Sequence, residues 1–178
     1  NKDLHFGHIG GVFVHADIFA RFLCDRIGKE NVLFVSGTDC YGSSIVEAFR
    51  IAVAENGFRG DIEQFVRHNH ELQKASLSSF DISLNLYAAS ALDGPAKTHQ
   101  EVCEKLMRML FQEGHLTQRS GQQFYDPVTS MYLNGRQVEG ICPIDGCGSD
   151  RGYADECSLG HQYEPQDLIS PKSTLSGS

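Results

Sequence analysis

Apolar residues recur with the period of an α-helix in four stretches of the chain. These stretches are residues 9–27, 43–56, 61–80 and 95–113. Two short runs between them predict strands. Residues 31–36 are an apolar run rich in strand-forming residues, which predicts a strand buried on both faces in a parallel sheet, and residues 83–88 alternate. The order helix, strand, helix, helix, strand, helix is typical of an α/β fold with a doubly wound sheet, and we expect its opening strand to lie before residue 1.

After Gly114 the pattern changes to short β-like pieces. The turn dipeptides Asp126-Pro127 and Asn134-Gly135 separate several of them. The pieces are residues 115–119, 123–125, 131–133 and 137–140. We therefore predict an incomplete α/β domain in residues 1–114 and a separate small β-rich unit in residues 115–178.

The composition is that of a globular protein, because the 178 residues are 40% apolar and 21% charged. A net charge of −8 argues against a surface that neutralises a nucleic-acid backbone, so DNA is not an expected partner. The sequence has no apolar run of about 20 residues and no signal peptide, which predicts a cytoplasmic protein without a membrane partner. Since the chain starts at Asn1 and not at Met, we expect an N-terminal segment to be missing.

The first candidate for chemistry is His5-Phe6-Gly7-His8, at the expected start of the first helix. A helix start presents free N–H groups and the positive end of the helix dipole, so it can bind an anion. Gly7 and Gly10 would let a phosphate approach the backbone closely. The two imidazoles can donate hydrogen bonds to a phosphoryl group during its transfer. The alternative is two ordinary histidines at a helix cap.

The second candidate is Asp39, in the loop that follows the first predicted strand. Ligands of open parallel sheets bind beyond the carboxyl ends of the strands, so Asp39 could meet a substrate cation such as the α-ammonium of an amino acid. An aspartate in a loop can equally bond its own backbone in a turn. On these residues alone we favour the turn.

The third candidate is a cluster of metal-binding residue types with the spacing Cys-x4-Cys-x9-Cys-x3-His. Three thiols and one imidazole within about twenty residues can close a tetrahedral zinc site. Such a site would be structural, because no position is left open for water. The predicted ligands are Cys142, Cys147, Cys157 and His161. The alternative is a loop of reduced cysteines, and we expect buried free thiols for the other cysteines, Cys24, Cys40 and Cys103.

Taken together, these motifs resemble the methionyl-tRNA synthetases, a family of class I aminoacyl-tRNA synthetases. His5-Phe6-Gly7-His8 is similar to the His-Ile-Gly-His signature of class I, and Gly37-Thr38-Asp39 is similar to a loop of the methionyl family. Residues 163–177 are the most specific part, because other class I synthetases do not share this stretch. The resemblance also covers residues 9–11, 16–22, 41–42, 125–127 and 142–143.

The resemblance implies a partial Rossmann-like catalytic domain in residues 1–114 and a connective-peptide insertion with a zinc knuckle in residues 115–178. It implies a ligase that forms methionyl-adenylate from methionine and ATP and then transfers the methionyl group to tRNA. The second half of the nucleotide fold and the anticodon-reading helices are not in these residues, so we expect the chain alone to be inactive.

Residue by residue, the resemblance implies that His5, Gly7, His8 and Gly10 bind ATP and that both histidines are catalytic. It implies that Asp39 binds the ammonium group of methionine, which outweighs the turn interpretation. Zinc would be held by Cys142, Cys147, Cys157 and His161. The family usually has two Cys-x-x-Cys pairs, and it often has Glu at the position of Cys40, so this chain departs from it at both places.

Two other functions remain open on the sequence. One is a stand-alone, zinc-stabilised binding module related to these enzymes. The other is a class I synthetase for another amino acid, which fits the histidine motif but not residues 163–177.

Overall fold

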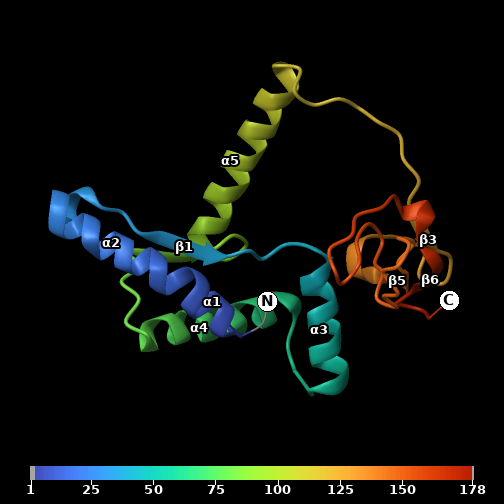
Figure 1. The fold of residues 1–178 in the computed structure, drawn as a ribbon, viewed down its shortest axis with the longest axis horizontal. Helices are drawn as coiled ribbons and strands as arrows, with labels where there is room; N and C mark the ends of the chain where they lie inside the picture. The colour runs from blue at the N-terminus through green and yellow to red at the C-terminus, as the bar shows by residue number, and fades with distance from the viewer. Residues whose placement is uncertain (1–2, 178) are drawn as a thin grey trace. The chain divides into compact units, whose positions relative to one another are not determined.

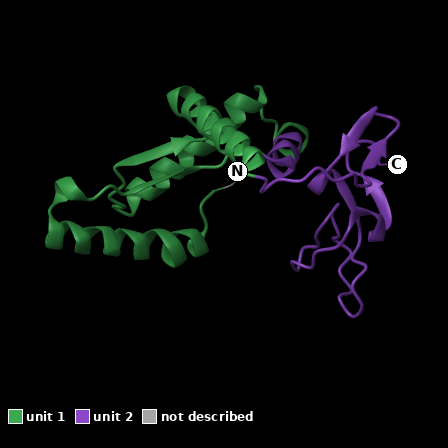
Figure 2. Cartoon of the chain, turned by 90° about the horizontal axis from the view of Figure 1, so that it is seen from above, with its two compact units in different colours: residues 1–41, 51–113 green, residues 42–50, 114–178 purple. Residues whose placement is uncertain are grey.

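The computed structural model describes residues 3–177 and divides the chain into two compact units (Figure 2). The first unit comprises residues 1–41 and 51–113, and the second comprises residues 42–50 and 114–178. Among the described residues, none of the helices combines the length and the apolar character needed to cross a bilayer. Each unit is described on its own below.

The first unit opens with one helical segment in three parts (Figure 1). Its parts are α1 (Phe6–His8), a π-helical turn (Ile9–Phe13) and α2 (Val14–Ile27). The helical period predicted this segment, and Gly28 ends it with a φ of 89° that favours glycine. The π-turn was not predicted, and such turns often occur at functional sites.

The sheet of the first unit has two parallel strands, β1 (Val35–Thr38) and β2 (Leu86–Ala89). Both begin about three residues later than predicted, because residues 29–31 form a 3-10 turn and Asn85 bonds both backbone groups of Phe34 just before the ladder. The expectation that the first strand, residues 31–36, is buried on both faces is wrong. Val35 and Leu86 are half exposed, because these are the only strands of this sheet in the described part of the chain.

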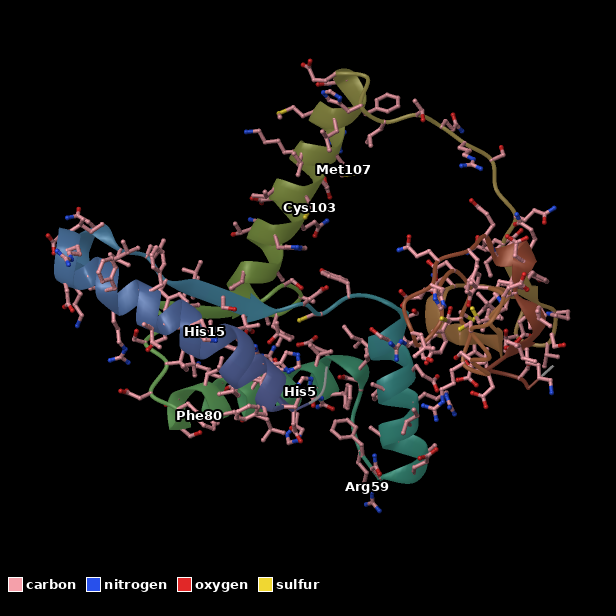
Figure 3. The ribbon with its side chains drawn as sticks, viewed as in Figure 1. His5, His15, Arg59, Phe80, Cys103 and Met107 are labelled. Atoms are coloured by element: carbon pink, nitrogen blue, oxygen red, sulfur yellow. The ribbon has the colours of Figure 1, made fainter. Side chains whose placement is uncertain are left out.

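Three further helices were predicted to within about two residues at each end. They are α3 (Ser43–Glu55), α4 (Ile62–Ser79) and α5 (Asp93–Gln112). Asp61 caps α4 as predicted, since its carboxylate accepts the Gln64 N–H at 2.8 Å. The apolar side of α5 does not pack within the described residues: α5 has no buried residue and extends away from the sheet, and most of its side chains, Cys103 and Met107 among them, are exposed (Figures 1 and 3).

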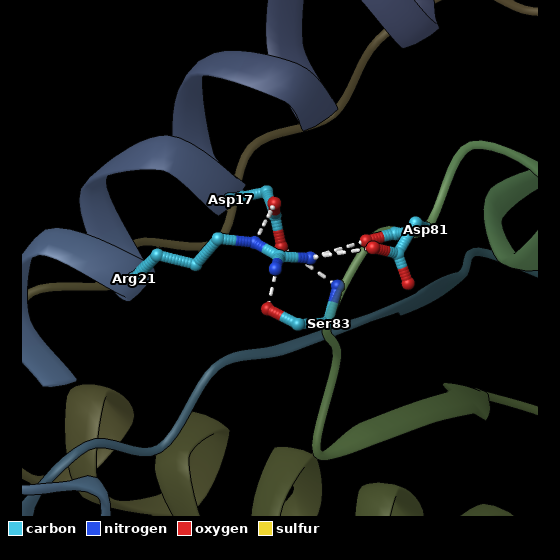
Figure 4. A network of polar contacts seen from close by, with 4 residues as sticks. All are labelled: Asp17, Arg21, Asp81 and Ser83. Carbon is cyan, nitrogen blue, oxygen red and sulfur yellow. Dashed lines mark hydrogen bonds and ion pairs between the residues drawn. The ribbon is translucent and has the colours of Figure 1, made fainter.

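A buried carboxylate joins α2 to the segment before β2 (Figure 4). Asp17 accepts hydrogen bonds from Arg21 Nε at 2.6 Å and from the Ser83 N–H at 2.7 Å, and Arg21 reaches on to Asp81. Burial opposes the ionisation of Asp17, but the hydrogen bonds from Ser83 and Arg21 outweigh it and lower its pKa. The buried face of α2 therefore includes the charged Asp17, while Phe19 and Phe22 of the same helix are exposed.

Replacing Asp17 by Asn is expected to lower the stability of the protein by about 2 kcal/mol, because the hydrogen bonds from Arg21 and Ser83 lose a buried, charged acceptor. The pKa of Asp17 is depressed by folding, so its contribution is present above the ordinary pKa of aspartate and is lost as the pH falls through the folded value. Thermal unfolding of wild type and D17N between about pH 3 and pH 7 measures both effects. The exposed Asp25→Asn is the control, and an equal loss in D25N would contradict the assignment.

The second unit contains two antiparallel strand pairs. The strands are β3 (Phe124–Asp126), β4 (Met131–Leu133), β5 (Val138–Ile141) and β6 (Ile169–Ser173). Its small core consists of Leu133, Val138, Ala154 and Leu168. The sequence missed β6 because Pro171 interrupts it, which an edge of a two-stranded sheet tolerates.

One prediction in the second unit was wrong, because residues 115–119 form no strand. The turn predicted at Asn134-Gly135 is present, as a 3-10 turn over residues 135–137. The fully buried Asp126 joins the two strand pairs, because Ser173 Oγ donates to its carboxylate at 2.6 Å. This hydrogen bond is the largest effect on Asp126, and with the backbone N–H groups of residues 128 and 129 it lowers the pKa of the carboxyl despite burial.

Candidate functional site

The histidine motif forms the first turn of the helical segment, and both imidazoles are exposed there (Figure 3). The Gly7 N–H donates to His5 Nδ1 at 3.1 Å, and the His5 N–H donates to His8 Nδ1 at 3.4 Å. The ring centroids lie 3.9 Å apart. Since both Nδ1 atoms accept, the neutral rings carry their protons on Nε2. The turn therefore offers two imidazole N–H donors to solvent at the start of a helix.

Gly10 lies within the π-turn, next to this pair. A Cβ on Gly10 would lie 3.3 Å from the ring of Phe6, and a Cβ on Gly7 would lie 2.9 Å from the ring of His5. A side chain at position 7 would thus displace the His5 imidazole from its hydrogen bond. The glycines keep the rings close to the backbone of the turn.

Asp39 follows the last residue of β1 and is exposed. Its Oδ1 accepts the Tyr41 N–H at 3.1 Å, which is the turn geometry that the residues alone favoured. Within the described residues, its Oδ2 has no partner. Asp39 lines a cavity of about 730 Å³ at the carboxyl ends of β1 and β2, together with Ser90, His99 and Cys103. One carboxylate oxygen can therefore accept the hydrogen bond of the turn while the other binds a cation.

Neither His5 nor His8 is among the residues that line this cavity. Asp39 thus lies at the carboxyl ends of the strands, and His5 and His8 lie next to each other in the first helical turn. This cavity does not join Asp39 to the two histidines.

A buried polar cluster behind Asp39 was missed. The sequence offers no obvious partner for His68 or His70 and so predicts solvated positions for both, which holds for His68 and is wrong for His70. His70 Nδ1 lies 2.9 Å from Thr38 Oγ1, and its ring stacks on Tyr87 at 5.0 Å. Burial lowers the pKa of His70. The one sequence signal was its spacing of four and five residues from the apolar Val66 and Phe65 on the inner face of α4.

The three cysteines outside the candidate metal site, Cys24, Cys40 and Cys103, have different environments. Cys40 is buried, as predicted, and Cys24 is half-buried. The prediction for Cys103 is wrong, because α5 does not pack and leaves the thiol exposed, 3.6 Å from His99 Nε2.

The second unit brings Cys142, Cys147, Cys157 and His161 together, as their spacing predicted, and their ligand atoms lie within 4.8 Å of one another. Cys147 Sγ lies 3.9 Å from Cys157 Sγ, and His161 Nδ1 lies 3.2 and 3.5 Å from these two sulfurs. A tetrahedron with metal–ligand bonds of about 2.3 Å has edges of about 3.8 Å, so the cluster has the size of a four-coordinate metal site.

Backbone groups around the cluster favour thiolate at one cysteine. Burial acts to raise the pKa of Cys157, but hydrogen bonds from the backbone N–H groups of His161 and Leu159 outweigh it and lower the pKa to about 6. Burial raises the pKa of Cys142 to about 11. Metal binding at this site would require Cys142 to lose its proton, because the thiolate is the ligand.

Tyr163 ties the cluster's loop to the rest of the unit. Its hydroxyl donates towards the carbonyl oxygens of Tyr153 at 2.9 Å and Glu156 at 2.6 Å. A Cβ on Gly152 would lie 2.8 Å from this hydroxyl, so position 152 requires the absence of a side chain. The loop that carries Cys157 is thereby held against the core.

The helix start with two imidazole donors, the carboxylate beyond a parallel strand and the four-ligand cluster lie in the motifs by which the sequence resembles a class I tRNA synthetase. All 178 residues match the family model described as "tRNA synthetases class I (M)". The chain belongs to this family, the methionyl-tRNA synthetases.

Relatives over the whole chain carry the name methionine–tRNA ligase. The chain is 35% identical to the protein of Bacteroides fragilis over 179 residues, which is 100% of this chain and 24% of that protein. It is 35% identical to that of Cytophaga hutchinsonii, over 99% of this chain and 24% of that protein. It is 33% identical to that of Roseiflexus sp., over 99% of this chain and 28% of that protein. The chain thus spans about a quarter of the length of the curated relatives it matches.

Proposed function

We propose that this chain supplies the phosphate-binding and ammonium-binding groups of a methionine–tRNA ligase. In the proposed reaction, a carboxylate oxygen of methionine attacks the α-phosphorus of ATP, pyrophosphate leaves, and the methionyl group later passes to tRNA. The pairing of His5 with His8, with both Nδ1 atoms bonded to backbone N–H groups, carries this proposal. It leaves two Nε2–H groups to stabilise the charge that builds on the phosphoryl group.

The other site residues take complementary roles. Gly7 and Gly10 keep the backbone of the turn close to the phosphates, and Asp39 pairs with the α-ammonium of methionine through Oδ2. Methionine is the proposed amino acid because the relatives carry that name. The groups that complete the reaction lie in the remaining three quarters of such proteins, so the 178-residue chain alone is expected to show no methionine-dependent exchange.

We propose two domains with different tasks. Residues 1–114 form the first half of the nucleotide-binding catalytic domain, and residues 115–178 form the connective-peptide insertion. The insertion holds one structural zinc through Cys142, Cys147, Cys157 and His161. When bound, zinc would neutralise the thiolates and close the loop on the small core. The Nδ1 atom of His161 is the one that faces the sulfurs.

The catalytic proposal is tested by replacing His8 with Asn in the complete protein that carries these residues. The expected kcat of methionine-dependent ATP–pyrophosphate exchange falls about 10²-fold, because one donor to the transition state is lost. The exposed His15→Asn on the same helical segment is the control and is expected to retain wild-type exchange. Equal rates for H8N and wild type would contradict the role of His8, and absence of exchange in wild type would favour a binding module.

A further inference from the structure

A cluster of four hydrogen-bonded side chains lies directly behind Asp39. Thr38 Oγ1 is 2.9 Å from His70 Nδ1, 2.8 Å from Gln73 Oε1 and 3.1 Å from Tyr87 Oη. Tyr87 Oη also lies 2.9 Å from Gln73 Oε1. Thr38, His70 and Gln73 are buried. The Thr38 hydroxyl, at the end of β1, thus contacts side chains from both α4 and β2.

The protons of this cluster can be arranged consistently around Thr38. Gln73 Oε1 only accepts, so the single hydroxyl proton of Thr38 goes to it. In that arrangement His70 Nδ1 carries a proton and donates it to Thr38 Oγ1, and Tyr87 donates to Gln73 Oε1. The 3.1 Å approach of Thr38 Oγ1 to Tyr87 Oη is then a close contact without a proton of its own. Two hydrogen bonds on one buried hydroxyl restrict the rotamer of Thr38.

The backbone of Thr38 is fixed as well. Its carbonyl oxygen accepts the Ser90 N–H at 3.1 Å and faces Cys40 Sγ at 3.4 Å, and the ladder pairs it with Ala89. Successive side chains of a strand point to opposite sides. Locking Thr38 on the α4 side therefore sets the direction in which Asp39, the next residue, leaves the strand.

We propose that Thr38 and His70 are positioning residues that aim the Asp39 carboxylate at the ammonium group of the amino acid. The inference rests on the proposed function and adds two residues to it. Neither residue touches the substrate in this proposal. They act by fixing the carboxylate before the ligand arrives, which reduces the ordering that binding must supply.

The test compares Thr38→Val and Thr38→Ser in the complete protein. Valine keeps the shape and removes the hydroxyl, so we expect the KM for methionine in ATP–pyrophosphate exchange to rise about tenfold while the KM for ATP stays within about twofold. Serine restores the hydroxyl and is expected to return the KM for methionine to within about threefold of wild type. Melting temperatures of both variants, measured in parallel, exclude loss of folded protein as the cause.

His70→Asn and His68→Asn form a matched pair on one helix. The amide of H70N can still donate near the Nδ1 position, so its KM for methionine is expected to lie between those of wild type and T38V, whereas H68N matches wild type. An unchanged KM for methionine in T38V, or equal rises in the KM values for methionine and ATP, would overturn the positioning role. If wild type itself shows no methionine-dependent exchange, the proposed function fails first, and the two failures are thereby distinguished.

Discussion

Replacing Asp39 by Asn is expected to lower kcat/KM for methionine about 10³-fold in the complete protein, since losing one partner of a close charge pair costs roughly 2–5 kcal/mol. Asparagine keeps the Oδ1 acceptor for the Tyr41 N–H, so the turn after β1 should persist. The substitution therefore removes the charge proposed to bind the ammonium group and leaves the local fold intact. Methionine would be held by its other contacts alone.

The measurement is the initial rate of ATP–pyrophosphate exchange as a function of methionine concentration. The control is Asp25→Asn, which removes one exposed carboxylate of the same unit without touching the proposed site. A D39N variant whose kcat/KM stays within about threefold of wild type would show that the turn is the whole role of Asp39. A loss confined to the KM for ATP would equally contradict ammonium binding.

Replacing Cys157 by Ser is expected to abolish stoichiometric metal binding and to unfold the second unit. Structural zinc in small domains contributes roughly 10–16 kcal/mol of apparent binding free energy, which is also folding free energy. The core of this unit consists of four buried side chains, and such a small core cannot replace that contribution. Chelation of the metal from the wild-type protein should have the same effect.

Elemental analysis after dialysis gives the metal content, with one zinc per chain expected for wild type and none for C157S. Amide exchange of residues 124–173 reports on folding of the unit. Cys103→Ser on α5 is the control, because this thiol is exposed and lies outside the cluster. Full zinc content in C157S, or a chelated protein with unchanged protection in the second unit, would refute the structural role.

Several elements were predictable because their signals are local. The period of apolar residues located the helices, and Asp61 marked the start of α4 through its own cap. The strands were less well placed, since their limits depend on which residues face one another. The Asn85 side chain decides where the ladder with β1 begins, and it does so from 51 residues away in the sequence.

The residues of the candidate site also differ in how far the sequence predicted them. The spacing of Cys142, Cys147, Cys157 and His161 identified the candidate metal site, because all four possible ligands lie in one short loop-rich segment. The partner of His70 could not be predicted, since Thr38 is 32 residues away and only the packing of α4 against the sheet brings the two together.

The sequence by itself determined which segments are helical, which four residues come together as possible metal ligands, and which motifs are proposed to bind the phosphate and ammonium groups. These follow from residue types at short spacing. Only the tertiary structure decided that α5 stays exposed, that Asp17 is buried in an ion pair, and that Thr38 sits in a closed hydrogen-bond network. Burial and hydrogen-bond partners depend on residues far apart in the chain, and no local pattern specifies which of them will meet.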